Sequence, residues 1–269
     1  MHRLVLLSEP RRGAAGERLA RGTGSSLEYQ DRRAYQAGDD VRHVDWRALA
    51  RSDQVLVRQY RAEVLPRVEI VLDPSRSMAV EEAKAQAAVD LVALLASAAR
   101  GGGFECAVAL AGDRPELVEG ARFQGAGVEF GSRSAWPAAL QAATVRLRAG
   151  ALRVLVSDFL FPHDAAQLVR PLAARGGGLV LIQVLGASDV DPVGGEAVRL
   201  VDAESEVARD LVLDRRALER YRQRLARLTA GLQVECQRAG ARFVRAVAGT
   251  SLPAAARALA ESGVLELDG

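Results

Sequence analysis

The chain has 269 residues, of which 49% are hydrophobic and 26% charged, and its formal net charge is +2. This is an ordinary globular composition, with enough apolar residues for a sizeable core without disulfides or structural metals. The small net charge argues against a general attraction to nucleic acid, so we expect no nucleic-acid partner. No apolar run approaches the about 20 residues that a membrane-spanning helix needs, so we expect no direct membrane span.

The two cysteines, Cys106 and Cys236, lie in apolar or helical stretches and show no spacing typical of a zinc site. We expect both to be buried, and two free cysteines are typical of a reducing compartment. The hydrophobic stretch at the start of the chain is too short for a signal peptide. We therefore expect a cytoplasmic protein.

Two regions differ in pattern along the chain. Residues 1–65 are Arg-rich and weakly periodic, although Gln54–Tyr60 alternates apolar and polar residues as a β-strand does. We expect 1–65 to form an extended or β segment and 66–269 to form the main domain.

In the main domain, apolar strands alternate with helices. Strands are expected at Val68–Asp73, Phe104–Leu110, Leu152–Ser157, Leu179–Leu185 and Ala241–Ala248, with shorter ones near Leu117 and at Val198–Val201. Helices are expected at Ala79–Arg100, Ser134–Arg148, His163–Arg175, Asp214–Ala239 and Leu252–Ser262. The alternation predicts an α/β fold, with a doubly wound, mostly parallel sheet and helices on both faces.

Ligands of such sheets bind outside the carboxyl ends of the strands, where Asp73 and Asp158 both lie. Asp73, Ser75 and Ser77 are two residues apart, so in an extended loop one carboxylate and two hydroxyls point the same way. Such hard oxygen donors suit Mg²⁺, Mn²⁺ or Ca²⁺, and Asp158 would add a second carboxylate. In the alternative interpretation Ser75 or Ser77 caps the following helix and Asp73 bonds its own loop.

The string Asp73-x-Ser75-x-Ser77 after VEIVL, with Ser134 leading a helix and Ser157-Asp158 after LRVLV, resembles the metal-ion-dependent adhesion site of von Willebrand factor A domains. The resemblance implies a sheet with one antiparallel edge strand. It also implies a Mg²⁺ cofactor, with Mn²⁺ or Ca²⁺ possible, whose coordination an acidic residue of a bound protein completes. The implied ligands come from three loops: Asp73, Ser75 and Ser77 from the first, Ser134 from the second, and Asp158 from the third. In the second loop Ser134 stands where the family usually has threonine, and Ser132 is the other candidate.

A second string, in the N-terminal segment, resembles the bacterial domain-of-unknown-function family fifty-eight, von Willebrand A-like proteins often encoded beside MoxR-type AAA+ ATPases. Its residues are Arg33, Tyr35, Gly38, Asp39, Asp40, Arg42, Asp45, Trp46 and Arg51. The resemblance implies a protein partner, a MoxR-type AAA+ ATPase or its client. The residues themselves have two interpretations. A structural role would use turn chemistry, charge-assisted bonds and Trp46 over a core. The other role is a docking surface.

Several enzyme signatures are missing from the sequence. Ser75 stands where an aspartyl-phosphate phosphatase has its acid/base aspartate, and neither a GxxxxGK[ST] loop nor a Gly-x-Ser-x-Gly elbow occurs. We therefore expect no enzyme but a metal-dependent protein-binding module, an adaptor or co-chaperone of an AAA+ ATPase. Two alternatives stay open. One is a metal-dependent hydrolase with His163 or Asp158 as base, and the other is a scaffold with an unoccupied metal loop.

Overall fold

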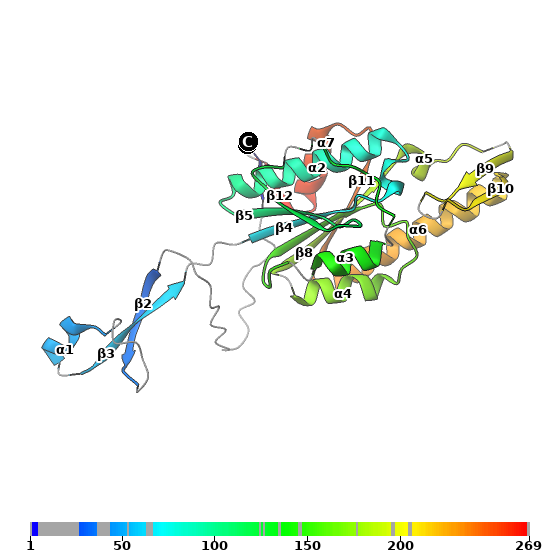
Figure 1. Ribbon diagram of the computed structural model, residues 1–269. Coiled ribbons are helices and arrows are strands. Elements are labelled where there is room, and N and C mark those ends of the chain that lie inside the picture. Colours follow the sequence, from blue (N-terminus) through cyan, green and yellow to red (C-terminus); the bar gives the residue numbers. More distant parts are fainter. Residues whose placement is uncertain are drawn as a thin grey trace. The chain divides into compact units, whose positions relative to one another are not determined.

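A computed structural model describes residues 2–4, 27–36, 44–52, 54–62, 67–123, 125, 127–133, 136–144, 147–175, 177–194, 197–203 and 206–267. The chain forms two compact units, shown in Figure 1. One unit comprises residues 1–11 and 66–269, and the other comprises residues 12–65. The larger unit holds the candidate site.

The larger unit is built on a six-stranded sheet. Its strands, in spatial order, are β11 (Arg242–Val247), β8 (Gly178–Leu185), β7 (Leu152–Ser157), β4 (Arg67–Leu72), β5 (Glu105–Leu110) and β6 (Glu116–Glu119). The first five run parallel, and β6 pairs antiparallel with β5 at the edge. The predicted mostly parallel sheet is confirmed, and it has the one antiparallel edge strand that the resemblance implied.

Helices cover both faces of this sheet (Figure 1). On one face lie α2 (Glu82–Gly101) and α7 (Leu252–Glu261), and on the other lie α3 (Trp136–Thr144), α4 (Ala165–Arg175) and α6 (Arg215–Arg238). Side chains of a strand alternate between the two cores, so Ile70 belongs to the first and Val71 to the second. Because both faces are covered, β7 is buried along its whole length.

Helix α2 forms because its apolar residues recur at helical spacing. Ala88, Leu91, Val92 and Leu95 lie at i, i+3, i+4 and i+7, and all four are buried. The helix begins at Glu82, later than the sequence predicted, because a 3-10 turn, η2 (Arg76–Ala79), follows β4 first. The chain therefore reaches α2 through a tight turn that follows Ser75, its N-cap, and contains Ser77.

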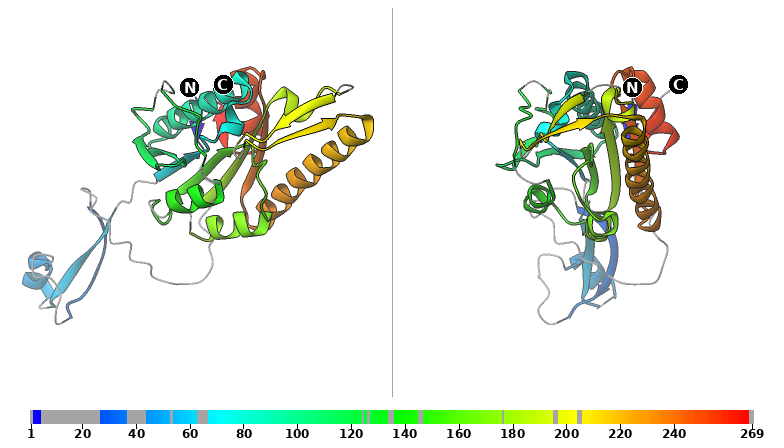
Figure 2. Two further views of the ribbon diagram at one scale, coloured as in Figure 1. Left: turned by 45° about the vertical axis from the view of Figure 1, so that its right-hand side comes forward. Right: turned by 90° about the vertical axis from the view of Figure 1, so that its right-hand side faces the viewer.

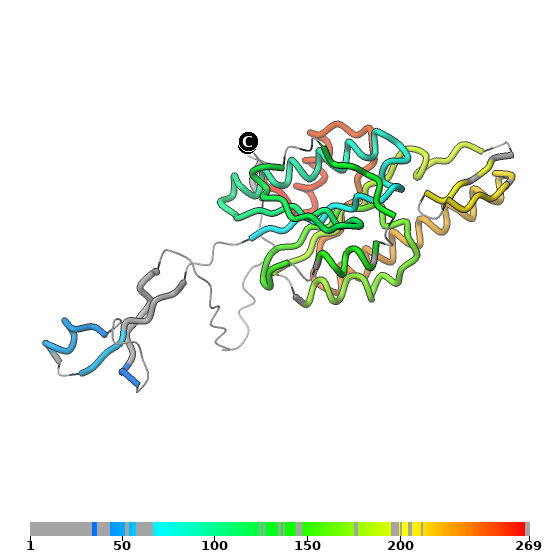
Figure 3. The backbone as a smooth tube through the Cα atoms, viewed as in Figure 1, coloured from blue at the N-terminus to red at the C-terminus, as the bar shows by residue number. Residues whose placement is uncertain are grey.

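Smaller elements extend the larger unit. β1 (His2–Leu4) pairs antiparallel with β12 (Leu265–Leu267), although these N-terminal residues were expected in the separate segment. A short helix, α5 (Ala187–Val190), follows β8, and a hairpin of β9 (Ala197–Val201) and β10 (Ala208–Val212) comes next. Figures 2 and 3 trace this hairpin as it leaves the main sheet. The sequence pattern indicated β9 but missed β10.

The smaller unit contains an antiparallel pair, β2 (Leu27–Ala34) and β3 (Leu56–Ala62), and one short helix, α1 (Trp46–Ser52). Asp45 caps this helix, because its Oδ1 accepts the backbone N–H groups of Arg47 and Ala48, each at 3.1 Å. The carboxylate is fully buried. Asp45 thus has a structural role within its own unit.

Other residues of the N-terminal string are placed differently. The interpretation in which Trp46 covers a core finds no support within the smaller unit, where this side chain is 63% exposed. Tyr35 and Arg51 are also exposed, the latter in the last turn of α1, and Arg33 belongs to β2. Gly38, Asp39, Asp40 and Arg42 lie outside the described residues. The exposed aromatic rings favour the docking interpretation for this part of the string.

Both cysteines are free and buried, as predicted. Burial raises the pKa of the Cys106 thiol to about 11 and that of Cys236 to about 12, so neither forms the reactive thiolate near neutral pH. Within the part of the chain that the structure describes, none of the helices combines the length and apolar character that a bilayer crossing requires.

Candidate metal centre

The centre lies where two neighbouring parallel strands end. Leu72 of β4 is opposite Val156 of β7, and the N–H of Asp73 donates to the Val156 carbonyl at 3.0 Å. Asp73 and Asp158 therefore leave the sheet at the same edge. Each is only 1% exposed. Two carboxylates, an expensive pair to bury, are thus brought together by the order of the strands.

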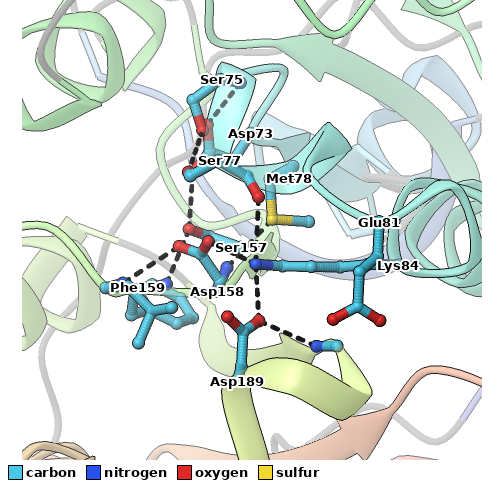
Figure 4. A network of polar contacts seen from close by, with 12 residues as sticks. Asp73, Ser75, Ser77, Met78, Glu81, Lys84, Ser157, Asp158, Phe159 and Asp189 are labelled. Atoms are coloured by element: carbon cyan, nitrogen blue, oxygen red, sulfur yellow. Dashed lines mark hydrogen bonds and ion pairs between the residues drawn. The ribbon is translucent and has the colours of Figure 1, made fainter. Parts of the chain in front are cut away.

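The first loop arranges oxygen atoms around Asp73 (Figure 4). Asp73 accepts from the N–H of Ser75 at 3.0 Å and from the hydroxyl of Ser157 at 2.6 Å. The hydroxyl oxygens of Ser75 and Ser77 lie 3.0 Å apart. Ser75 holds the N-cap position of η2, but its side chain makes no capping hydrogen bond. Of the capping alternative, the bond of Asp73 to its own loop is present and a cap by the Ser75 side chain is not.

The second loop meets the first through Ser132. This residue forms a parallel bridge with Ser75, and its N–H and that of Gly131 both donate to the Pro74 carbonyl at 3.1 Å. The Ser132 hydroxyl donates to Asp113 Oδ1 at 3.0 Å, and this bond holds the second loop in place. Ser134, the first choice from the sequence, lies outside the described residues. The structure thus sets Ser132 directly beside the metal loop.

The third loop is strained and firmly held. Phe159 has a φ of 55°, in the left-handed region that bulky residues rarely adopt. Its N–H donates to the Ser157 hydroxyl at 3.0 Å, and the N–H of Leu160 donates to Asp158 Oδ1 at 3.0 Å. Such strain persists where the surroundings fix the backbone, often at functional sites. The Leu160 N–H in turn holds Asp158 Oδ1 in place.

Lys84 binds the third loop from inside the protein. Its Nζ lies 2.8 Å from Asp158 Oδ2, 2.8 Å from Asp189 Oδ2 and 3.1 Å from the Ser77 carbonyl, which accepts a hydrogen bond (Figure 4). It is the only lysine of the sequence, and it is 1% exposed. A single ammonium group thus joins the first loop, the third loop and α5.

The position of Lys84 in the sequence indicates a buried charge. Lys84 precedes Ala88, Leu91 and Leu95 at the spacing of one helix face, so it occupies the buried stripe of α2. A charge on such a stripe needs a partner inside the protein. Asp189 had no such signal, because α5 is a four-residue helix with no periodicity to read.

A second link joins the same two segments. The Glu81 carboxylate accepts the N–H groups of Ala187 and Ser188, at 3.0 and 2.8 Å, and also binds the Ser188 hydroxyl. Gly186 makes this approach possible, since a Cβ there would lie 2.5 Å from Glu81 Oε1. The start of α2 and α5 therefore hold one another through both Glu81 and Lys84.

The interior of the centre holds more carboxylates than cations. Burial raises the pKa of Asp73 to about 7, and the nearby Asp158 charge adds to this while hydrogen bonds from Ser157 and Ser75 oppose it. Burial lowers the pKa of Lys84, but the attraction of Asp158 and Asp189 outweighs it and leaves that pKa above its ordinary value. When ionised, three carboxylates face one ammonium.

The oxygen atoms of the first loop fit a hard divalent cation. Neighbouring ligands of an octahedral Mg²⁺, each at about 2.1 Å, lie about 3 Å apart, and the Ser75 and Ser77 hydroxyl oxygens have this separation. Among the described residues no group of three or more His, Cys, Asp or Glu side chains is arranged for a metal. A metal here would therefore depend on the two serines and Asp73, while Asp158 shares its charge with Lys84.

His163, the base of the hydrolase alternative, has other contacts. Its Nδ1 lies 2.8 Å from the Phe161 carbonyl oxygen, and its ring packs on that of Phe161 with centroids 4.6 Å apart. It lines a cavity of about 390 Å³ beside α3 and α4. Asp164, rather than His163, caps α4 by accepting the N–H of Gln167 at 2.9 Å.

The doubly wound sheet, with oxygen donors from successive loops at its carboxyl edge, has the α/β architecture that the resemblance to von Willebrand factor A domains implied. The chain matches the family described as "Protein of unknown function DUF58" over residues 31–231, and it belongs to that family.

The "Uncharacterized protein Rv1480" of Mycobacterium tuberculosis (strain ATCC 25618 / H37Rv) is 31% identical over 216 residues, which cover 74% of this chain and 68% of that protein. Two solved structures are more distant. BatB from Bacteroides thetaiotaomicron is 13% identical, with 74% and 98% of the chains covered and a TM-score of 0.40. A von Willebrand factor type A protein from Catenulispora acidiphila is 16% identical, with 49% and 35% covered and a TM-score of 0.34. Likenesses of structure at this level carry no functional information.

The raised pKa of Asp73 predicts a pH dependence of stability. Between its ordinary value of 3.8 and about 7, the folded protein binds this proton more tightly than the unfolded chain does. The free energy of unfolding should therefore fall as the pH rises from about 4 to about 7 and then level off, by at most roughly 4 kcal/mol. In Asp73→Asn the fall should be smaller, as measured by urea unfolding in EDTA.

Other carboxylates titrate in the same range, so the control is Asp191→Asn, which changes an exposed aspartate paired with Arg222. That variant should keep the pH profile of the unmodified protein. If Asp73→Asn and Asp191→Asn show the same profile, Asp73 does not have the raised pKa.

Loss of the buried ammonium should destabilise the fold. Lys84→Met keeps the length of the side chain but leaves Asp158 and Asp189 without their cation, which should lower the free energy of unfolding by about 3–5 kcal/mol. Adding Asp158→Asn should recover part of the loss, because it removes one uncompensated charge. Urea unfolding measures both variants.

The matched control is Arg215→Met, which breaks an exposed pair with Glu219. That change should cost less than about 1 kcal/mol. Equal losses for Lys84→Met and Arg215→Met would show that the buried cluster does not stabilise the larger unit.

Proposed function

We propose that this protein is a protein-binding module that takes an acidic side chain of its partner through a divalent cation held by Asp73, Ser75 and Ser77. The observation that carries the proposal is the pair of serine hydroxyls, 3.0 Å apart, beside a buried carboxylate. Two hydroxyls and one carboxylate bind a divalent cation only weakly. Such a site gains from a ligand that a second protein supplies.

Mg²⁺ suits this arrangement best, with Mn²⁺ or Ca²⁺ as alternatives. It prefers oxygen ligands and keeps exchangeable water positions, so a partner carboxylate can enter its coordination sphere. Bound there, the ion would add positive charge beside Asp73 and beside the two carboxylates, Asp158 and Asp189, that share Lys84. The residues of the chain would hold the ion and fix the direction from which the partner approaches.

The partner follows from the family resemblance. We propose an adaptor or co-chaperone that acts in the cytoplasm with a MoxR-type AAA+ ATPase or with its client, and that binds no nucleic acid. Binding rather than catalysis is proposed because Ser75 stands where a phosphatase has its proton carrier. The exposed Trp46 and Tyr35 of the smaller unit are candidates for a second contact with the partner.

Two alternatives make different predictions. A hydrolase would use an ion-bound water with His163 or Asp158 as base, and it would turn over phosphoester or peptide substrates in the presence of Mg²⁺, Mn²⁺ or Ca²⁺. A scaffold with an unoccupied loop would bind its partner equally well in EDTA. Either result would replace the metal-dependent binding function.

Metal binding should raise the melting temperature by mass action. At a free Mg²⁺ concentration about 100 times the dissociation constant, the folded state gains about 2.7 kcal/mol. Asp73→Ala and the double variant Ser75→Ala/Ser77→Ala should lose this response, because they remove the proposed ligands. Thermal unfolding in millimolar Mg²⁺ and in EDTA measures the shift within each variant.

Ser262→Ala is the matched control, since the Ser262 hydroxyl donates to the Leu259 carbonyl at the end of α7. This variant should keep the full metal response. In a pull-down from host cells, the AAA+ ATPase should be captured with Mg²⁺ and lost with EDTA or with the double serine variant. An unmodified protein whose melting temperature ignores millimolar Mg²⁺, Mn²⁺ and Ca²⁺ would rule out the proposed function.

A further inference from the structure

A glutamate from the β9–β10 hairpin reaches the rim of the candidate metal centre. Its Oε1 lies 2.5 Å from Nη1 of Arg76 and 3.1 Å from Nη2 of Arg133. Arg76 stands between Ser75 and Ser77 in the first loop, and Arg133 follows Ser132 in the second. One carboxylate oxygen of Glu206 is therefore held between the two loops that build the centre.

The two arginines are carried by backbone that is fixed independently of Glu206. The N–H of Arg133 donates to Asp113 Oδ1 at 3.2 Å, and the neighbouring Ser132 N–H donates to Pro74 at 3.1 Å. Arg76 belongs to η2, directly after the bridge between Ser75 and Ser132. The pair thus forms a clamp, Arg76 and Arg133, that would persist if Glu206 left.

The hairpin turn itself does not explain the glutamate. Glu206 has a φ of 60°, in the left-handed region, and its N–H donates to the Asp202 carbonyl at 2.9 Å. Glycine or asparagine would adopt this conformation with less strain. The turn therefore does not require a glutamate here, whereas the contact with the clamp uses its carboxylate.

The contact is of a kind that another carboxylate can replace. Glu206 and Arg133 are 61% and 63% exposed, and Arg76 is 30% exposed, so water screens the ion pairs. The hydrogen bond from Arg76 lowers the pKa of Glu206, which keeps it ionised. Guanidinium groups bind any carboxylate that presents itself in their plane.

We propose that Arg76 and Arg133 form a carboxylate-binding clamp beside the metal loop, that Glu206 fills it in the free protein, and that an aspartate or glutamate of the partner protein displaces Glu206 on binding. The inference rests on the proposed function in placing the partner at this edge of the sheet. It adds a recognition element made of the chain's own cations. It also makes the β9–β10 hairpin an internal competitor of the partner.

The test uses the full chain and a fluorescein-labelled hexaglutamate peptide, with hexaglutamine as the uncharged control. Fluorescence anisotropy at low salt gives the dissociation constant in Mg²⁺ and in EDTA. Glu206→Gln should bind hexaglutamate about fivefold more tightly than the unmodified protein, the change that release of an exposed ion pair allows. Adding Arg76→Gln or Arg133→Gln should remove the gain.

The matched control is Glu219→Gln, which neutralises an exposed glutamate paired with Arg215 on α6. It should leave the affinity unchanged, and circular dichroism melting confirms that every variant is folded. An affinity gain that appears in EDTA as well as in Mg²⁺ supports the clamp even if the metal function fails. A metal-dependent melting shift without any gain in Glu206→Gln, or a gain that survives loss of both arginines, overturns the clamp and leaves the metal function standing.

Discussion

The parallel pairing of β4 with β7 is the constraint on which the candidate centre depends. Parallel neighbours end at the same edge of a sheet, so the register that sets Leu72 opposite Val156 also brings Asp73 to Ser157 and Asp158. A shift by one residue would turn every side chain of a strand to the opposite face. Since both faces of these strands are packed into cores, the packing of the whole sheet resists such a shift and holds the carboxylates together.

Bringing the carboxylates together has an electrostatic cost that the protein only partly offsets. Lys84 compensates Asp158 and Asp189, while burial raises the pKa of Asp73 toward its neutral form. Well-packed apolar residues often replace buried ion pairs with no loss of stability, so stability alone does not account for the cluster. Buried carboxylates that outnumber Lys84, next to two hydroxyls, agree with the proposed cation site.

The sequence predicted this edge of the sheet well and its details poorly. Asp73 and Asp158 were foreseen because long apolar strands have a clear pattern and their ends are the usual ligand positions. The Lys84–Asp189 contact was not, because it joins a helix start to a four-residue helix far along the chain. The exposure of Trp46 within its own unit was not foreseen, since hydrophobicity alone does not tell an exposed ring in a small unit from a core residue. The bridge between Ser132 and Ser75 was not foreseen either, because no local pattern encodes it.

The segment between β8 and β10 is tied to the metal loop at two points. At its start, α5 is bound through Glu81 and Lys84, and at its turn Glu206 reaches Arg76. The Lys84 part of the first link is buried and short, so it fixes where the hairpin begins, whereas the second link is exposed and weak. If a partner carboxylate takes the place of Glu206, the hairpin turn is released while its base stays anchored. Such coupling is reciprocal. A ligand that binds the hairpin only after it has left the clamp should strengthen partner binding, and the partner should strengthen the binding of that ligand by the same factor.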